Sequence, residues 1–310
     1  MQLVRHDCLS CGRSCHGSMI PIIDESERAR IIGFAELMGL GDPMNGNFLR
    51  MDKGACLFLG EDNLCSIHKK YGHMQKPAVC RQFPLVATQT ESGIRVHVDP
   101  SCYTAMSTWR TGTPIPDQPL IASTINLSGF ELSEEEKILR MVSRAKTTAG
   151  LLGLMSGSKS RKPKAPQGFD GNLIELIQNA KISELLTEPD MGAAFANSIA
   201  AIIQVEGCDF KAPTNSPSKV RERWAIETVR RVVWLRLTPN IPTVRGVALL
   251  TLAGATLAHW LCEKDDDFAL FLSGWIRALR SPLFVRRLVP NADTLRRLSG
   301  VGKIGLIRAR

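Results

Sequence analysis

The stretch Cys8-Leu-Ser-Cys11-Gly-Arg-Ser-Cys15 decides the fold of this 310-residue chain. Two cysteines separated by two residues let two thiolates converge on one metal, while the backbone N–H groups between them hydrogen-bond the sulfurs. Gly12 permits the tight turn that such a knuckle needs. The stretch therefore predicts a small domain that is organised around a metal.

Further cysteines follow in the first third of the chain and can supply more ligands from distant loops. The candidate metal ligands are Cys8, Cys11, Cys15, Cys56, Cys65, Cys80 and Cys102. Four convergent thiolates suffice for a zinc ion or an iron–sulfur cluster, and the spacing alone leaves both open. Disulfides and unligated thiols are the weaker alternatives, because thiols of a chain without a secretory signal stay reduced. Cys208 and Cys262 are expected to be free thiols.

The composition excludes several classes of protein. Hydrophobic residues make up 44% of the chain and charged residues 22%, which excludes wholesale disorder, collagen and coiled coil. The longest apolar stretch, Val247 to Cys262, is shorter than the roughly 20 residues that span a bilayer. The N-terminus also has no apolar core of signal-peptide length. We therefore expect a cytoplasmic protein without a transmembrane segment.

The order of the sequence patterns predicts an α+β fold that leans mostly to α. A small, metal-organised, cysteine-rich head with a short β-hairpin precedes a helical region. Asp24 with Glu27 has the spacing of a capping box and opens a helix to Met38. The hairpin is expected at 85–90 and 94–99, where apolar and polar residues alternate. The predicted domains are a cysteine-cluster domain at 1–115, a connecting helix and basic linker at 116–170, and a helical domain with a basic tail at 171–310.

Helical patterns fill most of the rest of the chain. Ser133 with Glu136 forms a second capping-box pattern and predicts a helix to Met155. An exposed linker is expected at 156–168, where basic residues and prolines occur without an acid. Further helices are predicted at 172–186, 190–205, 218–237, 243–263, 265–280 and 291–299.

Several ordered pieces of the first third resemble a known family. These pieces are Cys8-x2-Cys11-Gly12-x2-Cys15, Cys56-Leu-Phe-Leu59, Cys65-Ser-Ile-His68 and Lys76-Pro77-Ala-Val-Cys80-Arg81-Gln-Phe83-Pro84. Together they resemble the cysteine-cluster superfamily, a zinc- or iron-chelating domain. Ser14 stands where that family usually has its third cysteine, and His16 is the candidate substitute.

The longer gap between Cys65 and Cys80 is similar to that of the flagellin lysine N-methylase branch, which also carries a helical C-terminal region. This resemblance implies a 4Fe–4S cluster rather than zinc, S-adenosylmethionine as a second cofactor, and methylation of lysine side chains on a flagellin-like protein. It also implies that Arg81 contacts the cofactor, because Arg81 directly follows a ligand. Catalytic residues remain unknown. The candidates, chosen by residue type only, are Tyr71, Tyr103, His68, His73 and the run Asp265-Asp266-Asp267.

The basic charge lies almost entirely in the tail. Nine basic residues and one acid, Asp293, lie between Arg277 and Arg310, so this segment holds a net +8 of the chain's +9. A solvated face is the commonest meaning of such a run. The alternative function is a non-catalytic zinc- or iron-binding adaptor whose tail contacts nucleic acid or an acidic partner. Nucleic acid is the weaker partner, because the last 25 residues offer no aromatic side chain for base stacking.

Overall fold

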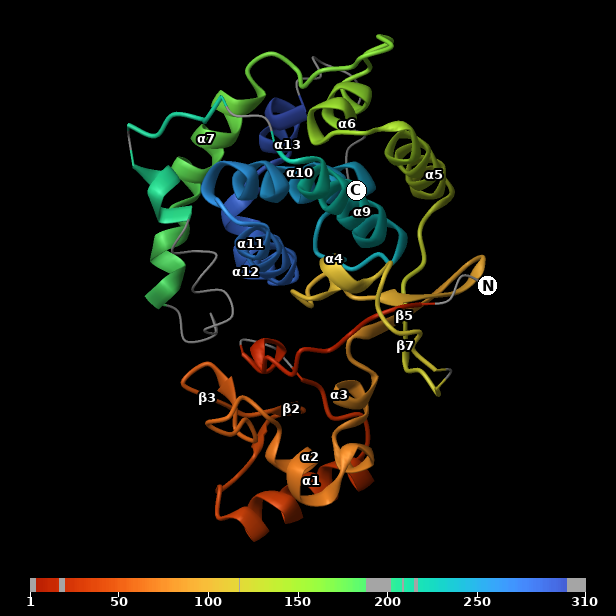
Figure 1. The fold of residues 1–310 in the computed structure, drawn as a ribbon, viewed down its shortest axis with the longest axis vertical. Coiled ribbons are helices and arrows are strands. Elements are labelled where there is room, and N and C mark those ends of the chain that lie inside the picture. The colour runs from red at the N-terminus through yellow and green to blue at the C-terminus, as the bar shows by residue number, and fades with distance from the viewer. Residues whose placement is uncertain are drawn as a thin grey trace.

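Short strands and helices near the N-terminus precede a larger set of helices in the computed structural model (Figure 1). The structure describes residues 4–16, 20–116, 118–187, 202–207, 209–214 and 217–299. Helices predominate and strands are few and short, which confirms the predicted α+β fold leaning to α. Three predicted features lie wholly or mainly outside the described residues: the helix at 190–205, the thiol of Cys208 and the segment 300–310.

The head and the segment that follows it contain short elements. They are η1 (Arg13–Cys15), α1 (Glu25–Met38), β1 (Met44–Asn45), β2 (Phe48–Leu49), β3 (Met51–Asp52), β4 (Ala55–Cys56), α2 (Ser66–Tyr71), η2 (His73–Gln75), α3 (Ala78–Gln82), β5 (Leu85–Thr90), β6 (Gly93–Val98), α4 (Ala105–Thr108) and β7 (Ala122–Thr124).

The helical region contains longer elements. They are α5 (Gly129–Arg144), α6 (Thr148–Met155), α7 (Phe169–Ala180), η3 (Ile182–Thr187), α9 (Lys219–Trp234), α10 (Val244–Leu261), α11 (Asp265–Ala278), α12 (Pro282–Leu288) and α13 (Ala292–Ser299).

The buried side chains form two separate hydrophobic cores. The smaller core belongs to the head and contains Ile31, Leu49, Phe58 and Ile67. The larger core begins at Leu85 and continues through the helical region. The β5–β6 hairpin, in which Leu85 pairs with Val98, therefore packs into the larger core. The hairpin itself was predicted correctly, whereas the domain boundaries at residues 115 and 170 stay predictions.

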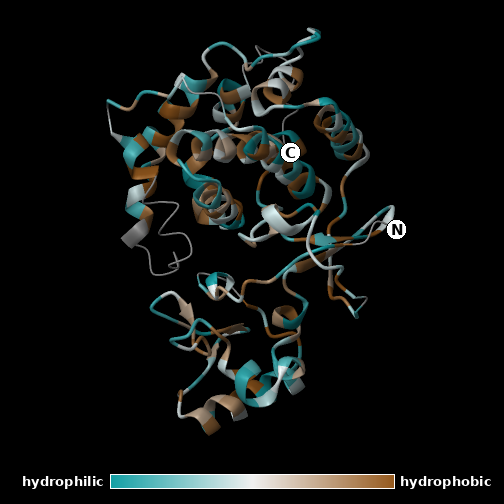
Figure 2. Ribbon diagram, viewed as in Figure 1, coloured by the Kyte–Doolittle hydropathy of each residue, from teal (hydrophilic) through white to brown (hydrophobic). Residues whose placement is uncertain are grey.

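The α10 helix lies at the centre of the helical region and packs against α5, α6, α9, α11 and α13. Its length and composition would allow it to cross a membrane, but 67% of it is buried inside the bundle, as in the core helix of a globular domain. Hydrophobic segments, brown in Figure 2, recur along the helices around it. Gly254 of α10 leaves room for the indole of Trp275, whose Nε1 donates to the carbonyl of Leu250 at 2.8 Å.

Of the two predicted helix starts, the one at Asp24 is confirmed and the one at Ser133 is wrong. Asp24 caps α1 as predicted, because its side chain accepts a hydrogen bond of 2.7 Å from the N–H of Glu27. The second capping box was placed wrongly: it is formed by Ser128 and Glu131, and Ser133 lies inside α5. The predicted single helix to Met155 is also wrong, because α5 ends at Arg144 and α6 begins after the Thr147 cap.

Candidate metal centre

Four of the predicted ligands come together on four different elements of the head. Cys15 ends η1, Cys56 lies in β4, Cys65 is the residue before α2, and Cys80 lies in α3. An isolated β-bridge joins His16 to Ala55, and another joins Leu59 to Cys65. All four thiols pack on the small core of the head. We call these four side chains, Cys15, Cys56, Cys65 and Cys80, the thiol quartet.

The quartet thiols are electrostatically coupled. Burial raises the pKa of Cys56 to about 12, and the charges of Cys15 and Cys65 add to this rise. Burial also raises the pKa of Cys80, as do the charges of the other three quartet thiols. Burial, followed by the charge of Cys65, raises the pKa of Cys15. Without a cationic partner Cys15, Cys56 and Cys80 favour the neutral thiol, so forming thiolates there requires positive charge.

The cation whose charge acts on three of the quartet thiols is Lys76 rather than Arg81. The charge of Lys76 acts against the rise in pKa at Cys15, Cys56 and Cys80. The Arg81 guanidinium instead donates hydrogen bonds to the backbone carbonyls of Met74, at 3.1 Å, and Lys76, at 2.6 Å. Arg81 therefore holds the loop that leads into α3, and its predicted contact with the cofactor stays a prediction.

The number of quartet thiols bears on which metal the site fits. Zn–S bonds of about 2.3 Å in a tetrahedron place sulfurs roughly 3.8 Å apart. Among the described residues, no three His, Cys, Asp or Glu side chains lie close enough to hold a single ion. A four-iron cluster holds its four cysteine sulfurs further apart, because the cluster itself lies between them. The quartet supplies four cysteine sulfurs, which is the number that either a zinc ion or a four-iron cluster takes.

The other three predicted ligands lie outside the quartet. Cys8 is exposed and Cys11 is half-buried, and the N–H of Ser10 donates to the Cys8 sulfur at 3.3 Å. This N–H to sulfur bond and the positive φ of 65° at Gly12 are the predicted knuckle geometry. Cys102 is buried, and its sulfur lies 3.9 Å from His6 Nε2.

Arg277 is a functional candidate that the sequence analysis missed. It belongs to α11, and its Nη1 donates to the carbonyls of Arg13, at 2.9 Å, and His16, at 3.1 Å. Its Nη2 donates to the carbonyl of Ser101 at 2.9 Å. The partners of Arg277 lie in loops far away in the sequence. The residues next to Arg277 therefore do not indicate its role, and only the folded structure shows these contacts.

The described part of the basic tail is solvated at Arg286, Arg287 and Arg297, as expected, whereas Arg277 departs from the expectation. Arg277 is only 9% exposed. Ion pairs join Arg280 to Asp99 at 2.7 Å, Arg287 to Glu184 at 3.1 Å, Arg296 to Asp293 at 2.7 Å, and Arg297 to Glu175 at 3.2 Å. Much of this charge therefore balances acids of the same chain.

Tyr103, a candidate named by residue type alone, lies close enough to Cys11 for the charge of Cys11 to act on it. The guanidinium of Arg13 lies 5.5 Å from the centre of the Tyr103 ring. Burial raises the pKa of Tyr103, and the charges of Asp266 and Cys11 add to this. By contrast, Tyr71 stacks on Phe34 with 4.4 Å between ring centres, as expected of a packing residue. No catalytic role follows from these contacts.

His16 remains a candidate metal ligand in place of the family's third cysteine, where this chain has Ser14. Its Nδ1 atom is buried and has no hydrogen-bond partner among the described residues. Burial and the charge of Arg277 lower its pKa, which keeps the imidazole neutral and able to donate a lone pair.

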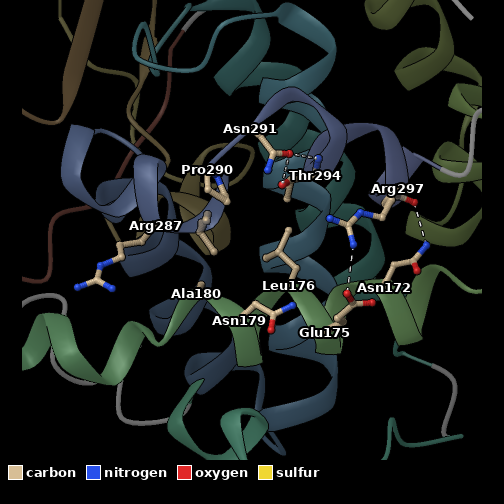
Figure 3. Close-up of a pocket in the computed structure, with 11 residues that line it drawn as sticks. Asn172, Glu175, Leu176, Asn179, Ala180, Arg287, Pro290, Asn291, Thr294 and Arg297 are labelled. Carbon is tan, nitrogen blue, oxygen red and sulfur yellow. Dashed lines mark hydrogen bonds and ion pairs between the residues drawn. The ribbon is translucent and has the colours of Figure 1, made fainter. Parts of the chain in front are cut away.

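A cavity of about 90 Å³ lies between α7, α12 and α13, in the helical region rather than in the head (Figure 3). The polar groups that line this cavity largely form hydrogen bonds and ion pairs with one another. Arg297 pairs with Glu175 and accepts a hydrogen bond from Asn172 at its carbonyl, while Asn291 accepts from Thr294. We therefore assign no ligand to this cavity.

Residues 7–103 match the family model CxxCxxCC, whose description reads "Putative zinc- or iron-chelating domain". Neither the curated proteins nor the solved structures compared with the chain give a match. The match covers about a third of the chain and leaves the flagellin methylase branch a prediction. The part of the chain that holds all seven predicted cysteine ligands is therefore similar to a zinc- or iron-chelating domain, and metal binding is its supported function.

Proposed function

We propose that the thiol quartet binds a 4Fe–4S cluster. The observation that carries this proposal is that four thiols on four elements pack on one small core and that their charges interact. The family match allows either zinc or iron, and the resemblance to the flagellin methylase branch favours iron.

The residues around the quartet have two tasks in this proposal. Phe58 and Ile67, which are at most 1% exposed, shield the site from water and oxidants. Lys76 and Arg277 bring positive charge that favours thiolates over thiols. A bound cluster supplies a rigid junction between four loops, and it can hold or orient a second cofactor.

We further propose that the chain is a cytoplasmic protein-lysine N-methylase that uses S-adenosylmethionine. The support is the resemblance of the Cys65 to Cys80 spacing to the flagellin methylase branch, together with the large helical region. Methyl transfer to an amine needs no redox step, so the cluster would organise the site rather than exchange electrons. The acceptor would be a lysine side chain of a flagellin-like protein.

Metal analysis after anaerobic purification tests the cluster. We expect iron and sulfide in equal amounts, about four of each per chain. Cys65→Ser should lose both, whereas Cys262→Ser should keep both, because Cys262 is a half-buried thiol outside the quartet. A colourless wild-type protein that contains zinc without sulfide would reject the iron–sulfur proposal.

Calorimetry with the cluster-loaded protein tests the methylase. Heat of binding from S-adenosylmethionine is expected at donor concentrations up to the millimolar range, and no heat at millimolar donor would exclude this activity. The adaptor alternative has less support, because five arginines of the described tail already have partners within the chain. They are Arg277, Arg280, Arg287, Arg296 and Arg297. It predicts DNA or acidic-protein binding that weakens steeply with salt, and no binding at low salt would exclude it.

A further inference from the structure

The connection between α6 and α7 carries positive charge that no acid of the described residues balances. Figure 1 shows this connection projecting from the helical region on the side away from the head, and its tip is hydrophilic in Figure 2. The sequence has no acidic residue between Glu136 and Asp170. We call residues 158–164 of this connection the basic loop. Its cations are all exposed, and they are Lys159, Arg161, Lys162 and Lys164.

Both ends of the basic loop are held at Gly153 of α6. The N–H of Ser158 donates to the carbonyl of Gly153 at 2.9 Å. A Cβ on Gly153 would lie 2.3 Å from the carbonyl oxygen of Lys164, so only glycine lets the chain return this close to the helix. Within the loop, the N–H of Ser160 donates to Ser158 Oγ at 3.3 Å, and the N–H of Lys162 donates to Ser160 Oγ at 3.1 Å. The loop therefore has a defined conformation that keeps its cations close together.

Ion pairing distinguishes the basic loop from the basic tail. In the tail, Arg280 pairs with Asp99 at 2.7 Å and Arg297 pairs with Glu175 at 3.2 Å. Among the residues that the structure describes, no acid forms an ion pair with a cation of the basic loop. Four like charges on one short loop repel one another, and neighbouring acids would relieve this repulsion. The positive charge of the loop is therefore available to an anionic partner outside the chain.

The side-chain types of the basic loop favour phosphates over an acidic protein surface. Apart from Pro163, which is half-buried, the loop contains only serine, lysine and arginine. Interfaces between proteins depend on aromatic and apolar anchors at their centre, which this loop lacks. Interfaces with nucleic acid are more polar and more positively charged, and at least half of their hydrogen bonds go to phosphate and sugar.

The shape of the basic loop favours a duplex over a single strand. Proteins bind single strands by stacking the bases on aromatic side chains, and the segment 156–168 has no aromatic residue. The five residue steps from Lys159 to Lys164 span at most about 17 Å, and a duplex carries about ten phosphate charges over that length. A projecting loop also fits the concave surface between the two phosphate rows of a groove.

We propose that the basic loop binds the phosphate backbone of duplex nucleic acid without reading its sequence. The three lysine ammonium groups and the Arg161 guanidinium each neutralise one phosphate, and the guanidinium can do so through two parallel hydrogen bonds. Phosphate contacts position a protein on a duplex but carry no sequence information. The thiol quartet takes no part in this binding, so the proposal does not depend on which metal the head holds.

Fluorescence anisotropy with the full-length, metal-loaded protein and a labelled DNA duplex of about 20 base pairs tests the proposal. Four phosphate contacts predict that the affinity of wild type falls about 150-fold between 50 mM and 200 mM salt. A loop variant in which all four cations become glutamine should bind at least about tenfold more weakly at 50 mM salt. Its substitutions are Lys159→Gln, Arg161→Gln, Lys162→Gln and Lys164→Gln.

A second quadruple variant controls for net charge. It removes the same charge at four exposed lysines outside the loop and should bind within about twofold of wild type. Its substitutions are Lys53→Gln, Lys70→Gln, Lys211→Gln and Lys219→Gln. An RNA duplex is the second probe, and binding of either duplex supports the proposal because both present phosphates. A single strand and polyglutamate should bind more weakly than the duplexes.

Three results overturn the proposal: wild type that binds neither duplex at 50 mM salt, equal affinities of the two quadruple variants, or tighter binding to polyglutamate than to either duplex. The last result would assign the loop to an acidic protein. If the loop variant fails to fold, acetylation of wild-type lysines decides. Protection of Lys159, Lys162 and Lys164 by the duplex supports the proposal, whereas protection confined to other lysines rejects it.

Discussion

Arg277 Nη1 lies 2.9 Å from the backbone carbonyl of Arg13, and this hydrogen bond joins α11 to the knuckle loop across 264 residues of sequence. Arg277→Met removes this bond and those to His16 and Ser101, which leaves two part-buried carbonyls and the buried carbonyl of Ser101 without this donor. We expect a loss of about 2–4 kcal/mol in the free energy of unfolding by denaturant.

Arg286→Met is the control for that variant, because Arg286 is an exposed arginine of the neighbouring α12. Its effect should stay within about 0.5 kcal/mol. Equal unfolding midpoints for the two variants would show that the contacts of Arg277 contribute no stability.

Glu27 connects the first helix to the element that carries Cys80. Its carboxylate accepts from the N–H groups of Ile23, at 3.1 Å, and Ala78, at 2.6 Å, at the start of α3. Glu27→Ala leaves both N–H groups unpaired, and we expect a loss of about 1–3 kcal/mol and faster release of quartet metal to a chelator. Glu36→Ala, an exposed position of α1, should change neither quantity. Unchanged metal release in Glu27→Ala would argue against a role in positioning Cys80.

A pair of glycine variants tests the packing of the central helix. A Cβ at Gly254 would lie 2.1 Å from Cδ1 of Trp275, so Gly254→Ala must displace the buried indole and should cost about 3 kcal/mol or more. A Cβ at Gly171, in the exposed face of α7, meets nothing within 4 Å. Gly171→Ala should therefore stabilise the protein by about 0.5–1 kcal/mol, since alanine favours the helix. Thermal unfolding measures the difference in Tm between the two variants. A similar Tm for both would refute the account that Gly254 makes room for the Trp275 indole.

The capping-box error shows the limit of local patterns. Both Ser128 and Ser133 are followed three residues later by glutamate, so the sequence offers two equivalent helix starts. The earlier start adds more than one helical turn and places Glu135 against Arg95, at 2.7 Å, and Arg236, at 2.9 Å. That choice depends on partners far away in sequence, which a pattern of four residues does not contain.

The same reasoning applies to the candidate metal centre. The knuckle and the Asp24 cap could be predicted, because each depends on a few neighbouring residues. The cysteine spacing also indicated that distant thiols would converge. It did not separate Cys102, which packs in the larger core, from the four thiols on the small core, because that packing depends on contacts between distant elements.

His97 makes the stability of the fold depend on pH. Burial and the charge of Arg231 lower its pKa to about 3, and its Nδ1 accepts hydrogen bonds from Arg231, at 2.6 Å, and Val98, at 2.7 Å. The unfolded chain takes up this proton near pH 6.5 while the folded chain does not, so stability is lost as the pH falls below 6.5.

His97→Asn keeps an acceptor near Nδ1 but cannot be protonated. Between pH 6.5 and pH 5, wild type should lose about 2 kcal/mol relative to this variant, at roughly 1.4 kcal/mol per pH unit. Urea unfolding at matched pH values measures the difference. Parallel curves for the two proteins would mean that His97 does not contribute to the acid sensitivity.

The long-range contact of Arg277 also has a consequence during synthesis on the ribosome. At about 5–20 residues per second, the 264 residues between Arg13 and Arg277 take roughly 10–50 s to translate. During that interval the nascent knuckle loop has emerged without the guanidinium that fixes its carbonyls. Any metal that reaches the knuckle loop in that interval meets it before the contacts with Arg277 exist.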